Sequence, residues 1–360
     1  MSDFALKMNS FRNNRLRDHE TPLSTVWLLN DIAESRGKQE LFTRQSPQAL
    51  KALRDTAVIQ SAESSNRIEG VTVAQARLHP LVLGQAKPRD RSEQEVQDYR
   101  RALDEIHSDY ATLSITPEAL QHLHARCQSA SGDAGQFKRV DNDIVEFLPG
   151  QAPLVRFRCV AAAETPAAVE QLCQYYQYAL DQDNIPPLIA IAALVLDFLC
   201  IHPFRDGNGR VSRLLTLLAL YQHRYEVGRY ISLERLIEES RKSYYECLRL
   251  SSQRWHDGKH QLTPWFNFLF AIIRRAYVEL EKRADQFKAP RGAKSERVLA
   301  AIRAQPGEFR LRDLERACPG VGREWIRTLL AKLKKSGDVV CSGRGPGARW
   351  RFIGNKGSNA

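Results

Sequence analysis

Residues 202–213 read His-Pro-Phe-Arg-Asp-Gly-Asn-Gly-Arg-Val-Ser-Arg, which places a base, a carboxylate, a glycine loop and closely spaced arginines in one short stretch. The stretch follows an apolar run at residues 188–201, and Pro203 should end that helix where the polar residues begin. The glycines should then open a second apolar helix, whose first turn presents backbone N–H groups and the positive end of the helix dipole. We therefore expect an anion site here, and phosphate fits it best.

The side chains of this stretch suit phosphoryl or nucleotidyl transfer. Arg210 and Arg213 are three residues apart, so both can project from one face of the first helical turn toward the same phosphates. Asp206 can hold Mg²⁺, which normally uses one or two carboxylates together with phosphate oxygens. His202 suits a general base, because an imidazole titrates near neutral pH. Taken one at a time, His202 could be a structural histidine, Arg210 and Arg213 could be surface charges, and Asp206 could cap the following helix. Their combination instead favours a catalytic site that positions the phosphates and stabilises their charge.

The stretch resembles the signature of the Fic family, usually written HPFx(D/E)GNGRxxR, and every specified position matches. The resemblance implies transfer of AMP from ATP to a serine, threonine or tyrosine hydroxyl of a protein, with His202 as the base and Asp206 as the Mg²⁺ ligand. It implies that the loop, anchored in the core by its phenylalanine, binds the nucleotide through Phe204, Gly207, Asn208, Gly209, Arg210 and Arg213. In related Doc-type kinases a lysine replaces the glycine at 209 and the nucleotide binds the other way round, so Gly209 favours AMP transfer over phosphorylation.

A second motif, Ser-Asn-Arg-Ile-Glu-Gly at residues 65–70, ends a helix that should begin at Ser46-Pro47. It resembles the inhibitory (S/T)xxxE(G/N) helix that many Fic proteins carry before the core. The resemblance implies that Glu69 pairs with Arg213 and excludes the γ-phosphate from a productive pose, because the carboxylate competes for the guanidinium and repels the polyphosphate. Glu69 could instead make a local cap or salt bridge, and in some relatives this glutamate is linked to removal of AMP.

Two segments of β-type residues, 140–148 and 154–160, surround Pro149-Gly150 and predict a hairpin. Its position resembles that of the Fic flap, which aligns a target segment by strand pairing over the active site. A plain surface hairpin is the alternative. A helix at residues 233–250 contains Tyr245, and Fic relatives often have a tyrosine beside the adenine at this place, although tyrosines on a helix face more often pack in the core.

Positive charge is concentrated at the C-terminal end of the chain. The net charge of the 360 residues is +11, and residues 286–360 contain 17 Lys and Arg against 6 Asp and Glu, so the preceding part is neutral. After a linker at residues 287–295, three short helices and two strands around a glycine-rich loop resemble a winged helix, a form often fused to Fic cores. Its recognition helix and wing should carry Arg323, Arg327, Lys332, Lys334, Lys335 and Arg344. Such a face suits DNA phosphates, and a protein-binding winged helix is the alternative.

The overall composition is typical of a globular protein of the cytoplasm. Neither a signal peptide nor an apolar run of membrane-spanning length is evident, so we expect no membrane association, and the seven cysteines are scattered without CxxC pairs. We expect a mostly α fold: a Fic-type helical core with a small β-hairpin flap, and a C-terminal winged helix-turn-helix domain. The expected domains are an N-terminal region with the inhibitory helix at 1–110, the catalytic core at 111–285 and the winged helix at 286–360.

The sequence therefore predicts a Mg²⁺-dependent protein adenylyltransferase that modifies a target protein and itself and is autoinhibited by Glu69. One alternative is a DNA-binding regulator whose Fic core senses nucleotide. Another is a Fic enzyme that transfers a different group or removes AMP. Fic relatives often form dimers, which makes a homodimer a further expectation, although no interface is visible in the residues.

Overall fold

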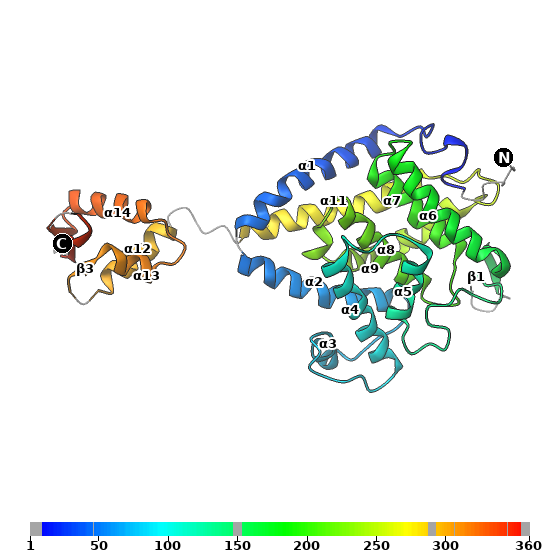
Figure 1. The fold of residues 1–360 in the computed structure, drawn as a ribbon, viewed down its shortest axis with the longest axis horizontal. Helices are drawn as coiled ribbons and strands as arrows, with labels where there is room; N and C mark the ends of the chain where they lie inside the picture. The colour runs from blue at the N-terminus through cyan, green and yellow to red at the C-terminus, as the bar shows by residue number, and fades with distance from the viewer. Residues whose placement is uncertain are drawn as a thin grey trace. The chain divides into compact units, whose positions relative to one another are not determined.

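The computed structural model describes residues 9–45, 47–146, 153–286, 293–305, 307–343 and 345–353. The chain forms two compact units, Met1–Ala284 and Asp285–Ala360 (Figure 1). The expected finer boundary at residue 110 stays a prediction.

The first unit is built mainly of helices, as predicted. They are α1 (Leu23–Gln45), α2 (Pro47–Ile68), α3 (Gln75–Val82), α4 (Arg91–Asp109), α5 (Pro117–Cys127), α6 (Thr165–Asp181), α7 (Pro187–Ile201), α8 (Asn208–Gln222), α9 (Leu233–Glu239), α10 (Arg241–Ser252) and α11 (Thr263–Gln286). The prediction of a single helix at residues 233–250 is wrong, because Ser240 leaves helical geometry and separates α9 from α10. Within the described parts of the chain, none of the helices combines the length and apolar composition needed to cross a lipid bilayer.

Helices α7 and α8 form the centre of this unit. Nearly every residue of both helices is buried; α7 is apolar on almost all sides, whereas the first turns of α8 also bury the polar side chains of Asn208, Arg210 and Arg213. Helix α7 packs against α6 and α8, and α8 also packs against α4 and α5 (Figure 1). The loop that joins α7 to α8 carries residues 202–207, the first part of the polar stretch, so two buried helices fix both of its ends.

Helix α2 is held in place by buried polar contacts as well as by apolar packing. It packs against α4 and α9. Between the three helices, the Glu234 carboxylate accepts hydrogen bonds from the Ser61 hydroxyl at 2.7 Å and from the Tyr99 hydroxyl at 2.9 Å. A buried carboxylate needs such donors, so moving α2 away would leave Glu234 without one of them. The end of α2, followed directly by Glu69, therefore has a fixed position.

The predicted hairpin is present as strands β1 (Asp143–Glu146) and β2 (Leu154–Arg158), which pair antiparallel. Asp143 lies opposite Arg158, and the register shifts between Ile144 and Val145. The expected turn at Pro149-Gly150 lies outside the described residues.

The second unit has its own small core. Its elements are α12 (Ala293–Arg303), β3 (Phe309–Arg310), α13 (Leu311–Ala317), α14 (Arg323–Lys335), β4 (Val339–Ser342) and β5 (Arg349–Phe352). The three strands form an antiparallel sheet in the order β3-β5-β4. Three helices and the two C-terminal strands occur in the predicted order, while the assignment as a winged helix stays a prediction. Arg344, expected at the wing tip, lies outside the described residues.

A buried polar cluster ties the N-terminal segment to α7. The Asp197 carboxylate accepts hydrogen bonds from the Ser10 hydroxyl at 2.5 Å, the Ser10 backbone N–H at 3.1 Å and the Trp255 indole N–H at 2.6 Å. Burial raises the pKa of Asp197 to about 6, although these hydrogen bonds oppose the rise. Above that pH, the hydrogen bonds from Ser10 and Trp255 stabilise the ionised carboxylate of Asp197 inside the protein.

We expect Ser10→Ala to lower the free energy of unfolding by about 1–3 kcal/mol, because it removes one of the donors to a buried carboxylate. Because the folded-state pKa is raised, Asp197 is mostly protonated at pH 5 and ionised at pH 8, so the loss should be larger at pH 8. Urea denaturation at both pH values measures it. Ser108→Ala on the exposed side of α4 is the control and should change neither value; an equal loss at both pH values would contradict the role assigned to Ser10.

Candidate active site

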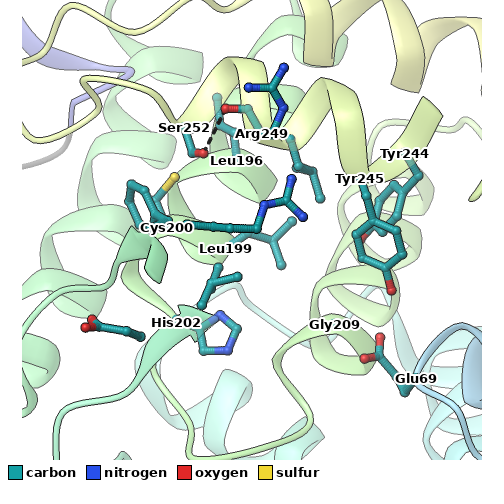
Figure 2. A pocket seen from close by; sticks show the side chains of 15 residues that line it. Glu69, Leu196, Leu199, Cys200, His202, Gly209, Tyr244, Tyr245, Arg249 and Ser252 are labelled. Carbon is teal, nitrogen blue, oxygen red and sulfur yellow. Dashed lines mark hydrogen bonds between the residues drawn. The ribbon is translucent and has the colours of Figure 1, made fainter. Parts of the chain in front are cut away.

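A cavity of about 290 Å³ lies where the end of α2, the α7–α8 region, α10 and the β1–β2 hairpin meet. Glu69, His202, Gly209 and Tyr245 are among its lining residues. Figure 2 shows these four residues around the cavity, with Glu69 next to Gly209 and below Tyr245. The structure thus brings together residues from the two sequence motifs, which lie more than a hundred residues apart.

His202 ends α7 in a left-handed conformation, with φ 53° and ψ 60°. Its side chain lines the cavity and is partly buried. Burial and, to a smaller extent, the Lys138 ammonium together lower the pKa of His202 to about 4, although the Glu69 and Asp206 carboxylates act in the opposite direction. The imidazole is therefore neutral near pH 7, which is the form that accepts a proton.

Phe204 and Asn208 hold the loop in the core and do not line the cavity. Phe204 is fully buried, and its ring stacks on that of His124 with centroids 3.9 Å apart. The Asn208 side-chain oxygen accepts from the Phe204 N–H at 2.9 Å, and its amide donates to the Phe204 carbonyl at 2.7 Å. These contacts fix the backbone on both sides of Gly207.

Both glycines are required by the geometry of the loop, for different reasons. Gly207 caps α8 with φ +78°, and a Cβ atom there would lie 2.9 Å from the Gln128 side chain. At Gly209, a Cβ atom would lie 2.1 Å from Oε1 of Glu69. The absence of a side chain at 209 therefore lets the Glu69 carboxylate rest on the first turn of α8, where the helix dipole favours negative charge.

Arg213 is the charged partner of Glu69, with 2.8 Å between its Nη2 atom and Oε1 of Glu69. Its Nε atom donates to the Ser65 hydroxyl at 2.8 Å, and Nη2 also donates to the Ser65 carbonyl at 2.9 Å. The Nη1 atom is buried without a hydrogen-bond partner and would lie 3.3 Å from a Cβ atom placed on Gly209. An anion over Gly209 could satisfy this donor, so the site fits a phosphate oxygen.

We expected Arg210 and Arg213 to project toward the same phosphates, but Arg210 points into the protein instead. Its guanidinium is buried and donates to the Glu95 carboxylate at 2.6 Å and to the Asn66 side-chain oxygen at 3.4 Å. The side of α8 that carries Arg210 faces α4, which supplies Glu95, so the guanidinium pairs inside the protein. Its contact with the loop is an ion pair with Asp206, with 3.5 Å between Nη2 of Arg210 and Oδ2 of Asp206.

Asp206 lies at the exposed end of the loop, with 65% of its side chain accessible to solvent. One carboxylate oxygen accepts from the Gly207 N–H at 2.6 Å, and the other lies 4.0 Å from the Arg91 guanidinium. The described residues contain no cluster of three or more His, Cys, Asp or Glu side chains that could hold a metal ion. A single exposed carboxylate fits Mg²⁺, which can take its remaining ligands from phosphate and water.

Tyr245 is partly exposed in the cavity, and its hydroxyl donates to the Ile68 carbonyl at 3.2 Å. Its ring lies against that of Tyr244, with centroids 5.2 Å apart. The tyrosine therefore lies over the end of α2 just before Glu69 and also lines the cavity (Figure 2).

Sequence reasoning missed a support behind His202, formed by the segment that precedes the hairpin. Lys138 donates from its backbone N–H to the Pro203 carbonyl at 2.9 Å and from its ammonium to the Ile201 carbonyl at 3.1 Å. Asn142 donates to the Phe204 carbonyl at 2.9 Å. These bonds hold the carbonyls on either side of His202 in its left-handed conformation. The partners are about sixty residues apart in the chain, so no spacing pattern marks them.

Comparisons with known proteins identify the type of domain that contains this cavity. Residues 114–220 match the model of the Fic/DOC family, so the chain carries a Fic/DOC domain. A Fido domain-containing protein from Dictyostelium discoideum is 30% identical over 99 residues, which cover 26% of this chain and 65% of that relative. Proteins of the family transfer nucleotide-derived groups to proteins and are generally transferases.

Solved structures show the same fold at low sequence identity. A Fic family protein from Desulfovibrio desulfuricans G20 matches with a TM-score of 0.61 and 22% identity, covering 95% of this chain and 99% of that one. A Fic domain-containing signalling protein from Bacteroides thetaiotaomicron VPI-5482 matches with a TM-score of 0.60 and 20% identity, over 71% of this chain and 97% of that one. Fic-1 from C. elegans matches with a TM-score of 0.55 and 18% identity, over 76% of each chain.

The Lys138 support gives a prediction for the titration of His202. Lys138→Met removes a positive charge beside the imidazole, so the pKa of His202 should rise from about 4 toward its ordinary value, while continued burial keeps it below that value. NMR titration of the histidine ring measures this directly, without an activity assay. Lys138→Arg should keep the pKa low, and Lys242→Met on the exposed side of α10 should leave it unchanged. An unaltered pKa in Lys138→Met would remove the basis for this electrostatic role.

Proposed function

We propose that this chain transfers AMP from ATP to a hydroxyl side chain of a target protein and to itself, and that Glu69 keeps it inactive at rest. The observation that carries the proposal is the Glu69–Arg213 ion pair, which lies over Gly209 in the same cavity as His202. The Glu69 carboxylate binds the buried guanidinium of Arg213, and it therefore occupies the place where a phosphate of the substrate would bind.

The proposed reaction is an in-line displacement at the α-phosphate of ATP. The target hydroxyl oxygen forms the new bond to phosphorus, the bond to the β-phosphate breaks, and pyrophosphate leaves. His202 takes the hydroxyl proton, which its lowered pKa and neutral imidazole allow at physiological pH. The N-terminus of α8 and the Nη1 atom of Arg213 supply donors for phosphate oxygens.

Mg²⁺ fits the site as an ion shared between Asp206 and the nucleotide. When bound, it would neutralise phosphate charge and orient the leaving group. Asp206 is the residue that would hold it, since its carboxylate is exposed at the end of the loop beside Gly207. Arg210 and Arg91 lie near that carboxylate and keep it oriented.

The proposed inhibition depends on one side chain and not on movement of the whole helix. Glu69 is 30% exposed on the cavity side, whereas the residues of α2 that face α4 and α9 are buried. Rotation of Glu69 alone would free Arg213 for the γ-phosphate and leave the Ser61–Glu234 contact intact. The inhibited and active forms would then share the same core.

The hairpin beside the cavity supports a protein as the second substrate. Leu154 and Val155 on β2 are 56% and 45% exposed, and Ile144 on β1 is 36% exposed. An exposed apolar strand pair at the cavity edge can bind an extended peptide segment by strand addition, which would bring a hydroxyl to His202. Transfer of a different group, or removal of AMP, remains the alternative and would use the same cavity. A homodimer and a cytoplasmic location stay predictions.

Glu69→Gly should raise self-modification at least tenfold, because it removes the competitor for Arg213. Incubation of the purified protein with ATP and Mg²⁺, followed by intact-protein mass spectrometry, should show the addition of AMP. The double variant Glu69→Gly with His202→Ala should show none, since it lacks the base.

Two glutamine variants test whether the effect belongs to the charge at 69. Glu69→Gln should also activate, since an amide keeps the size of the side chain but binds Arg213 weakly. Glu63→Gln, in the last turns of α2 and paired with Arg67, should not activate the protein. Equal labelling of wild type, Glu69→Gly and the double variant would overturn the proposal. A mass gain of another size would replace AMP with a different transferred group.

A further inference from the structure

Helix α14 of the second unit presents a strongly basic face to solvent. Ile326 and Leu330 are buried and face the small core of this unit. The exposed basic residues of the helix are Arg323, Arg327, Lys332, Lys334 and Lys335. Glu324 is the acidic residue of the helix, and it pairs with Arg327 at 2.9 Å. The helix thus carries a large excess of positive charge on its outer side.

Within the described part of this unit, internal ion pairs neutralise this charge only at Arg323 and Arg327. Arg323 pairs with Glu315 at 3.3 Å, but Lys332, Lys334 and Lys335 form no ion pair with any of the residues that the structure describes. Cations near a helix C-terminus complement the dipole, which accounts for a small part of such a cluster. The dipole does not account for the arginines near the start of the helix or for Arg351, which is exposed on β5.

The middle of the outer face carries small side chains. Helical periodicity places Thr328 and Ala331 opposite the buried Ile326 and Leu330, and both are exposed. Glu324 and Lys335 lie on the same line of the helix, before and after these two residues, while Arg327 flanks the line on one side and Lys332 and the exposed Trp325 flank it on the other. A helix with a small-residue centre and cationic edges can approach a narrow polyanionic surface closely, with its edges reaching charges on both sides.

Duplex DNA has the dimensions and charge that match this face. A helix of 13 residues is about 20 Å long, and the major groove of B-DNA, about 12 Å wide and bordered by phosphates, admits such a helix. The major groove of duplex RNA is too deep and narrow for it. An acidic protein surface would match the charge but gives no reason for the small-residue centre.

We propose that the face of α14 formed by Arg323, Arg327, Thr328, Ala331, Lys332 and Lys335 binds duplex DNA, with the helix in the major groove. This is a function of the second unit, separate from nucleotidyl transfer, and it does not depend on the chemistry at His202. Lysine and arginine contacts to phosphates release counterions, so binding weakens steeply as salt increases.

Fluorescence anisotropy of a labelled 30-base-pair duplex of mixed sequence, titrated with the full chain between 50 and 200 mM salt, tests the proposal. The variant Lys332→Gln with Lys335→Gln should bind about tenfold or more weakly, and its log–log salt slope should be shallower by about two. The matched control, Lys294→Gln with Arg303→Gln, removes the same charge from exposed positions of α12 and should retain most of the affinity.

A second variant separates helix insertion from charge alone. Ala331→Leu keeps every charge but fills the centre of the face, so it should weaken binding to duplex DNA, whereas His202→Ala should bind like wild type. The proposal is overturned if both charge variants weaken binding equally, if Ala331→Leu binds normally, or if duplex RNA or polyglutamate competes as well as DNA does. In the last case the face would be a general polyanion site.

Discussion

The buried guanidinium of Arg213 is the group on which the proposed active site depends. It binds the Ser65 carbonyl and hydroxyl and the Glu69 carboxylate, so it joins the end of α2 to the first turn of α8. One of its nitrogen atoms is left without a partner beside Gly209. A buried charge is costly unless it is paired. Without Glu69, the Arg213 guanidinium would lack an anionic partner, which favours binding of another anion at the same place. In the proposed mechanism, inhibition by Glu69 and binding of the substrate phosphate would therefore use the same cation.

The remainder of the first unit keeps that place rigid. Helices α7 and α8 are buried on nearly all sides, and Phe204 locks the loop between them into the core. Lys138 holds the carbonyls on both sides of His202, and Arg210 joins α8 to α4 through Glu95. Small displacements of catalytic groups can cost much of the rate, so such supports would contribute to the proposed reaction without touching substrate.

Local sequence patterns predicted most of the helices and the hairpin, but they could not predict contacts between residues that lie far apart in the sequence. The proline after the apolar run and the glycine loop correctly indicated where α7 ends and α8 begins. The resemblance of the two motifs to those of Fic proteins implied the Glu69–Arg213 pair, which the structure contains. Arg210 was placed toward the phosphates because spacing on a helix gives a direction but not the neighbouring helix that supplies Glu95. Lys138 was missed for the same reason, since its partners lie about sixty residues away.

The most direct test of the central claim is a crystal structure of the Glu69→Gly variant with Mg²⁺ and a non-hydrolysable ATP analogue. The claim predicts that the γ-phosphate lies over Gly209 and binds Arg213 where the Glu69 carboxylate lies in the resting protein, with the α-phosphate facing His202. A nucleotide whose γ-phosphate lies elsewhere, with Arg213 still bound only to Ser65, would contradict it. In that case Glu69 would be a structural partner of Arg213 and not a competitor of the substrate.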